Sequence, residues 1–192
     1  MIRLDIGCSF HKKPGYIGVD IESGPDVDII ADMAALPFKD SSIHEIHTRH
    51  TLEHVENPLQ CISELYRVTN AEGKMVIIVP HYSNSAYWAD LTHLRPFSAR
   101  TFQYFDLDYC MKSGFPIYLP KINLKIEKVI LTYWPDRITK SKTLFKRSVS
   151  RFLNRMLSYL ASKNPFLCER IWCSWVGGFY EVEFHLKVIK SK

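Results

Sequence analysis

A glycine turn near the start of the chain is the first segment that could do chemistry. The apolar run 2–6 ends at Gly7, and the next apolar run, 16–21, carries Asp20 near its end. A glycine directly after a strand lets backbone N–H groups approach a ligand closely, and a carboxylate at the end of the neighbouring strand can accept both hydroxyls of a ribose. The two segments predict a nucleoside site.

The short connection between these two strands narrows the choice of nucleoside. Fourteen residues lie between Asp5 and Asp20, and they include Pro14 and Gly15, so a full crossover helix hardly fits. A dinucleotide places its pyrophosphate at the start of such a helix, and the third glycine of the G-x-G-x-x-G pattern is missing here. S-adenosylmethionine has a ribose and an adenine but no phosphate, and it therefore fits this site better than NAD.

Histidines and aromatic residues gather in the segment 81–105, where we expect the acceptor of a transferred group to bind. Asp90 precedes His93 by three residues and can orient the His93 ring as a general base, with His81 as the alternative base. Arg95 can hold an anionic group on the acceptor. The expected acceptor-binding side chains are Tyr82, Tyr87, Trp88, Asp90 and Arg95.

The elements that position these residues follow from apolar periodicity. Short apolar runs predict strands at 2–6, 16–21, 27–31, 43–48, 75–79, 124–134 and 179–189, and residues 59–69 have helical spacing. Strands that alternate with helices form βαβ units, so we expect an α/β fold with a mainly parallel sheet. The acceptor segment would then lie over the carboxyl ends of the strands, where open parallel sheets bind ligands.

A basic segment lies between the last two expected strands. From Arg137 to Lys163 there are eight basic residues and no acidic one, so the basic character of a chain with net charge +5 belongs to this segment. Phe145, Val149 and Phe152 share one helical face, which predicts an amphipathic helix over about 140–162. We expect residues 135–178 to form a helical insertion that suits peripheral contact with an anionic membrane.

Length and composition favour one domain, 1–192, of an ordinary globular protein. The longest apolar stretches are far shorter than the ~20 residues that a membrane span needs. The segment 1–7 lacks the apolar region of a signal peptide, so we expect a cytoplasmic protein. The five cysteines are scattered without a C-x-x-C pair, which argues against a disulfide framework and a cysteine-based zinc site.

An ordered set of short motifs resembles the class I S-adenosylmethionine-dependent methyltransferases, and especially the group with a type 11 methyltransferase domain. The motifs are Leu4-Asp5-Ile6-Gly7-Cys8, Gly18-Val19-Asp20-Ile21, Ala31-Asp32, Leu36-Pro37-Phe38, His50-Thr51-Leu52-Glu53-His54-Val55, Glu64-Leu65-Tyr66-Arg67-Val68 and Val79-Pro80. The resemblance implies a Rossmann-like, seven-stranded, mainly parallel sheet whose last strand is antiparallel. The chain departs from the family at Ser9, which replaces the second glycine of G-x-G, and in its shortened first crossover.

The resemblance also implies where S-adenosyl-L-methionine binds. Gly7 and Cys8 would line its methionine end, with Asp5 beneath and His50 near the sulfonium. Its nucleoside end would contact four residues that follow the second and third strands. Among these, Asp20 would hold the ribose, Ile21 would pack on the adenine, Asp32 would accept from the adenine amino group, and the Met33 backbone would lie beside the ring.

His50, Glu53 and His54 also spell H-x-x-E-H, a pattern in which two histidines four apart on a helix can hold zinc. That site needs a long helix and a third ligand, and the methyltransferase interpretation already accounts for the segment. We therefore expect no metal.

These observations predict methyl transfer by in-line displacement to a small-molecule or glycolipid-type acceptor. Two alternatives stay open: an RNA methyltransferase that uses the segment 137–163 to bind phosphates, and a non-catalytic cofactor-binding or scaffold protein of the same fold. Thr48-Arg49-His50 stands where amino-methylating nucleic-acid enzymes of this class keep an Asn/Asp-Pro-Pro-aromatic motif, which makes nucleic acid an unlikely partner. The sequence leaves the oligomeric state open.

Overall fold

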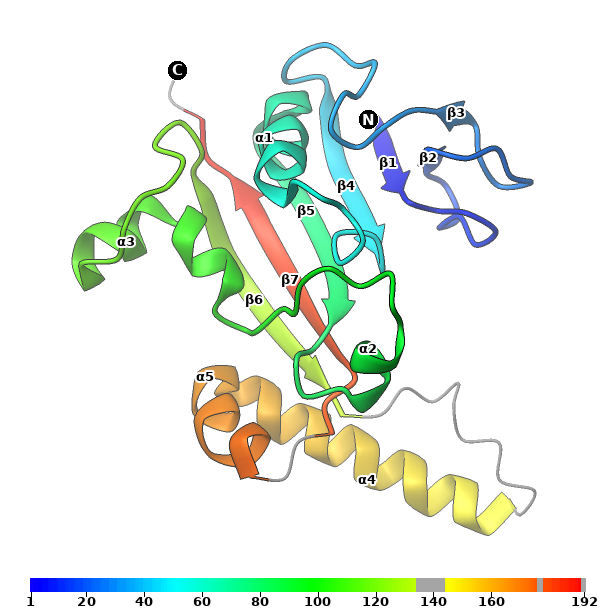
Figure 1. Cartoon of the computed structure of the whole chain (residues 1–192), viewed down its shortest axis with the longest axis vertical. Helices are drawn as coiled ribbons and strands as arrows, with labels where there is room; N and C mark the ends of the chain where they lie inside the picture. The colour runs from blue at the N-terminus through cyan, green and yellow to red at the C-terminus, as the bar shows by residue number, and fades with distance from the viewer. Residues whose placement is uncertain (134–143, 176–177, 191–192) are drawn as a thin grey trace.

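The computed structural model describes residues 1–133, 144–175 and 178–190. Its centre is one seven-stranded sheet with the strand order β3-β2-β1-β4-β5-β7-β6 (Figure 1). The strands are β1 (Arg3–Ile6), β2 (Ile17–Asp20), β3 (Ile29–Ile30), β4 (Ile43–Arg49), β5 (Thr69–Pro80), β6 (Leu124–Thr132) and β7 (Glu181–Val188). β1 to β5 pair in parallel, and β7 runs antiparallel to both β5 and β6. The expected Rossmann-like sheet with an antiparallel last strand is confirmed.

The helices are unevenly distributed along the chain. They are α1 (Pro58–Val68), α2 (Ser85–Ala89), the 3-10 helix η1 (Thr101–Phe105), α3 (Leu107–Ser113), α4 (Leu144–Lys163), α5 (Pro165–Cys168) and the π-helix η3 (Glu169–Cys173). Residues 7–42 contain no helix, so the expected loss of the first crossover helix is confirmed and extends to the next two crossovers. α1 begins where the Asn57 side chain accepts a hydrogen bond from the Gln60 N–H, with Pro58 at its first position.

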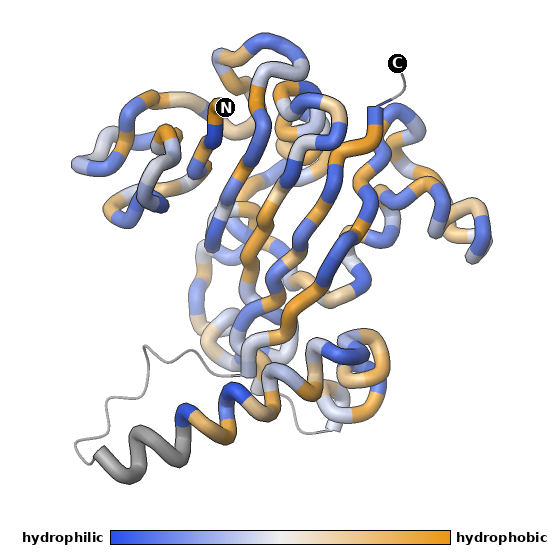
Figure 2. The backbone as a smooth tube through the Cα atoms, turned by 180° about the vertical axis from the view of Figure 1, so that it is seen from behind, coloured by the Kyte–Doolittle hydropathy of each residue, from blue (hydrophilic) through white to orange (hydrophobic). Residues whose placement is uncertain are grey.

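Only one face of the sheet carries helices among the described residues. α1 and the segment 81–120 lie over the face seen in Figure 1, whereas Figure 2 shows the strands from behind without a helix across them. The uncovered face carries polar pairs: Asp5 pairs with His47 at 2.6 Å, and the Tyr16 hydroxyl donates to Glu45 at 2.5 Å. A face with such side chains can stay in contact with water.

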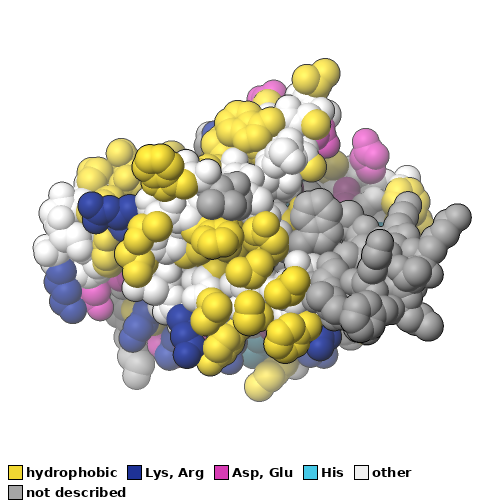
Figure 3. Space-filling view, turned by 90° about the horizontal axis from the view of Figure 1, so that it is seen from below, with side chains coloured by type: hydrophobic (Ala, Val, Ile, Leu, Met, Phe, Trp, Pro, Cys, Tyr) yellow, Lys and Arg dark blue, Asp and Glu magenta, His cyan; other side chains and the backbone are white. Residues whose placement is uncertain are grey.

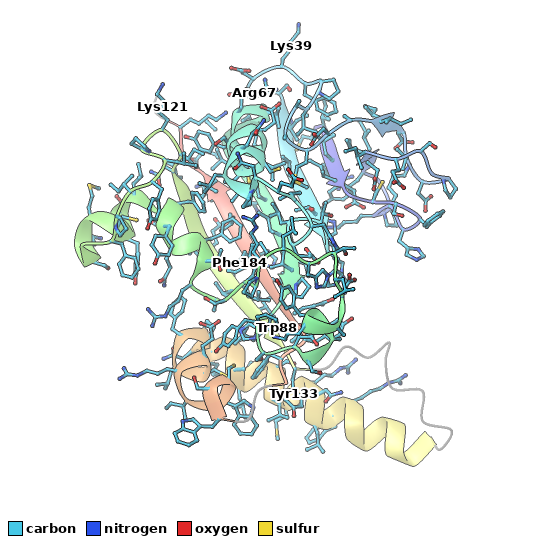
Figure 4. All side chains as sticks on the ribbon, viewed as in Figure 1. Lys39, Arg67, Trp88, Lys121, Tyr133 and Phe184 are labelled. Carbon is cyan, nitrogen blue, oxygen red and sulfur yellow. The ribbon has the colours of Figure 1, made fainter. Side chains whose placement is uncertain are left out.

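The core lies between the sheet and the covering layer. Leu4, Ile46 and Ile77 are completely buried on the covered face. Phe184, in the middle of β7 (Figure 4), packs against Phe102 of η1 with ring centroids 4.7 Å apart. This contact holds the segment after β5 against the sheet, and it thereby helps to position residues 81–105.

The helical insertion between β6 and β7 lies beyond the carboxyl ends of the parallel strands (Figure 1). The hydroxyls of Ser158 and Ser162 on α4 accept hydrogen bonds from the backbone N–H groups of Tyr133 and Leu131, both at 3.0 Å. The amphipathic helix expected over 140–162 is α4, although residues 137–143 of the basic segment lie outside the described residues. None of the described helices is both long enough and apolar enough to span a bilayer.

Candidate active site

A cleft of about 240 Å³ opens at the carboxyl ends of β1, β2 and β4. Its lining includes six of the eight residues expected to contact the cofactor, namely Gly7, Asp20, Ile21, Asp32, Met33 and His50. Ser9, Ala31, Thr51, His54 and Val55 also line it. Residues from four separate segments therefore meet at the predicted edge of the sheet.

The turn after β1 has the backbone of a glycine loop. Gly7 has φ +73°, and a Cβ added there would lie 2.0 Å from Oγ1 of Thr51, so only glycine fits. Ser9, which replaces the family's second glycine, has φ +45° and keeps the left-handed conformation that glycine adopts easily. The loop geometry is therefore retained although one glycine is lost.

Asp20 is held in the cleft by two backbone groups. Its Oδ2 accepts from the N–H of Ser9 at 2.9 Å, and its Oδ1 accepts from the N–H of Glu22 at 3.1 Å. Each carboxylate oxygen has a further lone pair, so Asp20 can still accept the two hydroxyls of a ribose. Ile21, beside it, is 66% exposed and offers an apolar surface to a planar ring.

Asp5 and Cys8 do not line the cleft. The Asp5 carboxylate is buried, and it accepts from the Lys13 N–H at 2.6 Å and pairs with His47 on the uncovered face. It thereby fastens the loop that stands in place of the first helix. Burial, together with the negative charges of Asp5 and Asp20, raises the pKa of the Cys8 thiol to about 11, so this thiol stays protonated.

A second pocket of about 280 Å³ continues the cleft, because His50 and His54 line both. Three residues expected from the segment 81–105, Tyr87, Asp90 and His93, line it. Glu53, His54, Asn84 and Tyr180 also line it and were not expected there. The sequence motif His50-x-x-Glu53-His54 includes two of these unexpected residues. Its residues form turns rather than the helix that the zinc pattern requires.

His50 lies at the junction of the two pockets with φ +53°. Its Nε2 contacts Glu181 at 2.7 Å, and its Nδ1 contacts Glu53 at 3.3 Å. Burial lowers the pKa of His50, but the hydrogen bonds to Glu181 and Glu53 outweigh burial and raise the pKa to about 8. Both ring nitrogens then donate at neutral pH, so His50 is a fixed cation rather than a base.

His93 carries a defined tautomer. Its Nδ1 donates to the carbonyl oxygen of Tyr87 at 2.9 Å, and the two rings stack with centroids 4.7 Å apart. Asp90 lies 3.7 Å from Nε2, which is too long for a hydrogen bond. The Tyr87 carbonyl therefore takes the orienting role that the sequence suggested for Asp90, and the Nε2 lone pair of His93 remains available.

The other candidates from the acceptor segment lie outside the pocket lining. His81 is completely buried between Ser83 and Glu169, with its Nε2 2.9 Å from the Glu169 carboxylate. It therefore joins the end of β5 to the insertion rather than facing an acceptor.

Arg95 and two aromatic candidates hold the loop together instead. Arg95 donates to the carbonyl oxygen of Glu56 at 2.6 Å. The Trp88 indole, labelled in Figure 4, donates to the Tyr82 carbonyl at 3.0 Å while its ring is largely exposed.

A larger cleft of about 570 Å³ lies at the opposite edge of the sheet, near Arg67 and Lys121 (Figure 4). Arg67 is paired there with Glu64 and Asp40, which neutralise it. The cleft contains none of the residues expected to bind the cofactor or the acceptor, so the smaller joined pockets are the candidate site.

Comparison with known proteins agrees with this geometry. Residues 13–77 match the family described as methyltransferase domain, type 11. A demethylmenaquinone methyltransferase from Renibacterium salmoninarum is 38% identical over 64 residues, which cover 33% of this chain and 27% of that protein. The chain thus matches only about a quarter of that relative's length.

Two solved structures share the fold over nearly the whole chain. A SAM-dependent methyltransferase from Archaeoglobus fulgidus is similar with a TM-score of 0.53 and 19% identity, over 96% of this chain and 85% of that one. A geranyl diphosphate C-methyltransferase from Streptomyces coelicolor A3(2) is similar with a TM-score of 0.57 and 13% identity, over 98% and 72%. The chain therefore has the class I methyltransferase fold, and about a third of it, residues 13–77, matches the type 11 methyltransferase family.

Proposed function

We propose that this protein is a methyltransferase that uses S-adenosyl-L-methionine and acts on a small, lipid-linked acceptor. The observation that carries the proposal is the pair of joined pockets at the carboxyl edge of the sheet, which share His50 and His54. One pocket has the features of a nucleoside site, and the other has the size and polar groups of a small acceptor site.

The residues of the cleft fit the cofactor. Gly7 and Ser9 keep the backbone open, Asp20 offers two acceptor oxygens, and Ile21 presents an apolar surface. S-adenosylmethionine supplies a methyl group bound to a sulfonium, which a nucleophile can take in an in-line displacement. The chain's own contribution is alignment of the acceptor, which can account for up to ~7–11 kcal/mol of the barrier.

His93 is the candidate base for a neutral acceptor. Because its Nδ1 hydrogen is held by the Tyr87 carbonyl, its Nε2 can take a proton from a hydroxyl or amine in the pocket. Such a base contributes about 10²–10⁴ in rate. His50, already protonated, instead keeps the wall between the two pockets in place.

The insertion supports a membrane-associated acceptor. Its α4, α5, η3 and the residues directly after η3 expose a set of large apolar side chains, namely Phe152, Leu153, Met156, Tyr159, Leu160, Leu167, Ile171, Trp172 and Trp175. Figure 3 shows hydrophobic side chains gathered on this face with basic side chains near its margin. Basic and apolar groups on one face suit the surface of an anionic bilayer.

An apolar groove lies in the insertion. It encloses about 290 Å³ between α4 and the segment 164–172, and Phe179 also lines it. Tyr180, the next residue, lines the acceptor pocket. The groove and the acceptor pocket therefore approach the same stretch of backbone, and the apolar lining of the groove suits the tail of a lipid-linked acceptor.

Binding and transfer assays test this function. Calorimetry with S-adenosylhomocysteine measures cofactor binding directly. Incubation with radiolabelled S-adenosylmethionine and separate lipid, aqueous and RNA fractions of a cell extract then measures which class is methylated. Label in the lipid fraction supports the proposal, and label in RNA supports the RNA alternative. Cofactor binding without label in any fraction supports the non-catalytic alternative.

A further inference from the structure

Three potential metal ligands meet in the acceptor pocket. Glu53 and His54 come from the turns after β4, and His93 comes from the loop after α2. One ligand atom from each lies within 4.8 Å of those of the other two. Metal–ligand bonds of about 2.1 Å bring such atoms within about 4.2 Å of one another, so small side-chain rotations suffice to bind one ion.

The hydrogen bond of its Nδ1 orients His93 so that its Nε2 can bind a metal ion. Its Nδ1 donates to the Tyr87 carbonyl at 2.9 Å, and its ring is fixed by stacking on Tyr87. A histidine that binds a metal usually donates its other N–H to a carbonyl or carboxylate, which fixes the tautomer. The Nε2 of His93 therefore carries the lone pair that a cation needs.

The ring of His54 is oriented in the same way, by the hydroxyl of Thr92, which is itself hydrogen-bonded to Asp90. The Thr92 hydroxyl donates its single proton to Asp90 at 2.7 Å, so its oxygen can only accept from the His54 Nδ1, 3.0 Å away. This arrangement also leaves Nε2 of His54 with a lone pair. The rings of His54 and His93 lie 4.7 Å apart, as neighbours on the same pocket.

Glu53 would contribute the negatively charged ligand, and one of its carboxylate oxygens is buried without a hydrogen-bond partner among the described residues. The residue is completely buried and lines the pocket. Its Oε1 contacts His50 at 3.3 Å, whereas its Oε2 has no hydrogen-bond partner among the residues that the structure describes. A buried carboxylate oxygen without a partner is unfavourable, and a bound cation would satisfy it.

We propose that Glu53, His54 and His93 bind one divalent ion of the first transition row, such as Zn²⁺, in the acceptor pocket. Two imidazoles and one carboxylate favour such an ion over Mg²⁺ or Ca²⁺, which prefer oxygen ligands. Three protein ligands also leave positions open for a further molecule.

The role of the ion rests on the proposed methyl transfer. His54 lines both pockets, so the ion would lie beside the cofactor cleft and could hold an acceptor oxygen. A hydroxyl bound to it loses its proton to solvent more easily. Its oxygen then forms the bond to the methyl carbon while the carbon–sulfur bond breaks and its electron pair stays on sulfur. With the ion bound, His93 is a ligand, and the ion takes over the task that His93 has as a base.

Metal binding to the tag-free protein tests the inference without an activity assay. After chelator treatment and gel filtration, Co²⁺ is titrated while its visible absorption is recorded, and Zn²⁺ is then added in competition. We expect one Co²⁺ per chain with a d–d spectrum that Zn²⁺ abolishes. Glu53→Gln, His54→Ala and His93→Ala should each weaken binding by at least about 100-fold. His44→Ala removes an exposed histidine at the far end of β4 and should leave binding unchanged.

The outcomes separate this inference from the proposed function. Absence of stoichiometric Co²⁺ binding, or equal binding by the wild type and the three ligand variants, overturns the metal site. Circular dichroism checks that each variant is folded, and S-adenosylhomocysteine calorimetry on the wild type, Glu53→Gln and His93→Ala checks the cofactor cleft, which His54 itself lines. If the wild type binds S-adenosylhomocysteine but not Co²⁺, the proposed function stands and the metal site is overturned. If it binds Co²⁺ but not S-adenosylhomocysteine, the metal site stands and the proposed function is overturned.

Discussion

Glu181, at the start of β7, accepts a hydrogen bond from His50, which lies at the end of β4 and 131 residues earlier in the chain. The same carboxylate pairs with Arg49. Burial raises the pKa of Glu181, but the hydrogen bonds from His50 and Arg49 outweigh burial and keep the pKa below its usual value. The last strand of the sheet thus fixes the residue that separates the cofactor cleft from the acceptor pocket.

Replacing Glu181 should therefore destabilise the protein. Glu181→Ala leaves His50 and Arg49 without their shared acceptor, and we expect a loss of ~1–3 kcal/mol in the free energy of unfolding. Glu183→Ala, two residues along the same strand, removes a more exposed pair with His185 and should cost less than ~1 kcal/mol. Urea denaturation measures both, and equal losses would contradict this account of the junction.

Asp20 should dominate the affinity for the cofactor's ribose. Asp20→Ala removes the acceptor for two hydroxyls, and we expect binding of S-adenosylhomocysteine to weaken by about 10–150-fold. Asp32→Ala should weaken binding less, because we expect adenine to be held by Ile21 and backbone groups as well. Asp108→Ala, on the exposed surface of α3, is the control. Unchanged affinity of the Asp20 variant in calorimetry would exclude the ribose assignment.

Ser9 should tolerate the glycine that the family carries. Its φ of +45° is unfavourable for a residue with a Cβ, so Ser9→Gly should stabilise the protein by up to ~1 kcal/mol and leave cofactor binding intact. Ser23→Gly, at an exposed position outside the left-handed region, should instead destabilise slightly because glycine gains freedom in the unfolded chain. The two changes in urea midpoint should differ in sign, and a shared sign would refute the strain argument.

His93 should matter for turnover and not for cofactor affinity. His93→Ala should lower kcat by about 10²-fold or more, because either a base or a metal ligand is lost. Binding of S-adenosylhomocysteine should stay within a factor of about two, since His93 lies in the acceptor pocket alone. Single-turnover kinetics beside calorimetry separates the two quantities. A large loss of cofactor affinity would place His93 in the wrong pocket.

The apolar face of the insertion should hold the protein on anionic vesicles. Ile171→Ser with Trp175→Ser removes two exposed apolar side chains, and we expect most vesicle retention at low salt to be lost. Met111→Ser, an equally exposed apolar residue on α3, should leave retention unchanged. Co-sedimentation with phosphatidylserine vesicles measures this. A wild-type protein that stays in the supernatant would eliminate the membrane proposal.

Much of the fold was predictable because its signals are local. The apolar runs placed all seven strands, and Pro14 with Gly15 correctly excluded a first crossover helix. β5 begins at Thr69, earlier than the expected start at residue 75, because Thr69 already pairs with Ile43 of β4. Local propensity could not show this, since the early part of β5 is polar.

The candidate site was less predictable because it depends on contacts between distant segments. The sequence favoured His93 as the base and kept His81 as the alternative, but it could not show that the buried His81 pairs with Glu169 of the insertion. In the sequence, Glu53 and His54 belonged to a family motif and to a helical zinc pattern, and neither placed them beside an acceptor. Their partner His93 lies about forty residues away, and only the folded chain brings the three together.

The strand β3 has consequences for hydrogen exchange. It is two residues long, forms the edge of the sheet and pairs with β2, which ends at Asp20. Because β3 has a neighbouring strand on one side only, its backbone amides should exchange with deuterium long before those of β4 and β5, which lie inside the sheet. A ligand that contacts both Asp20 and Asp32 would connect the end of β2 to the residues that follow β3 and would restrain this edge strand. The slowing of exchange at Ala31 and its neighbours would then report occupancy of the cleft, even where no acceptor is known.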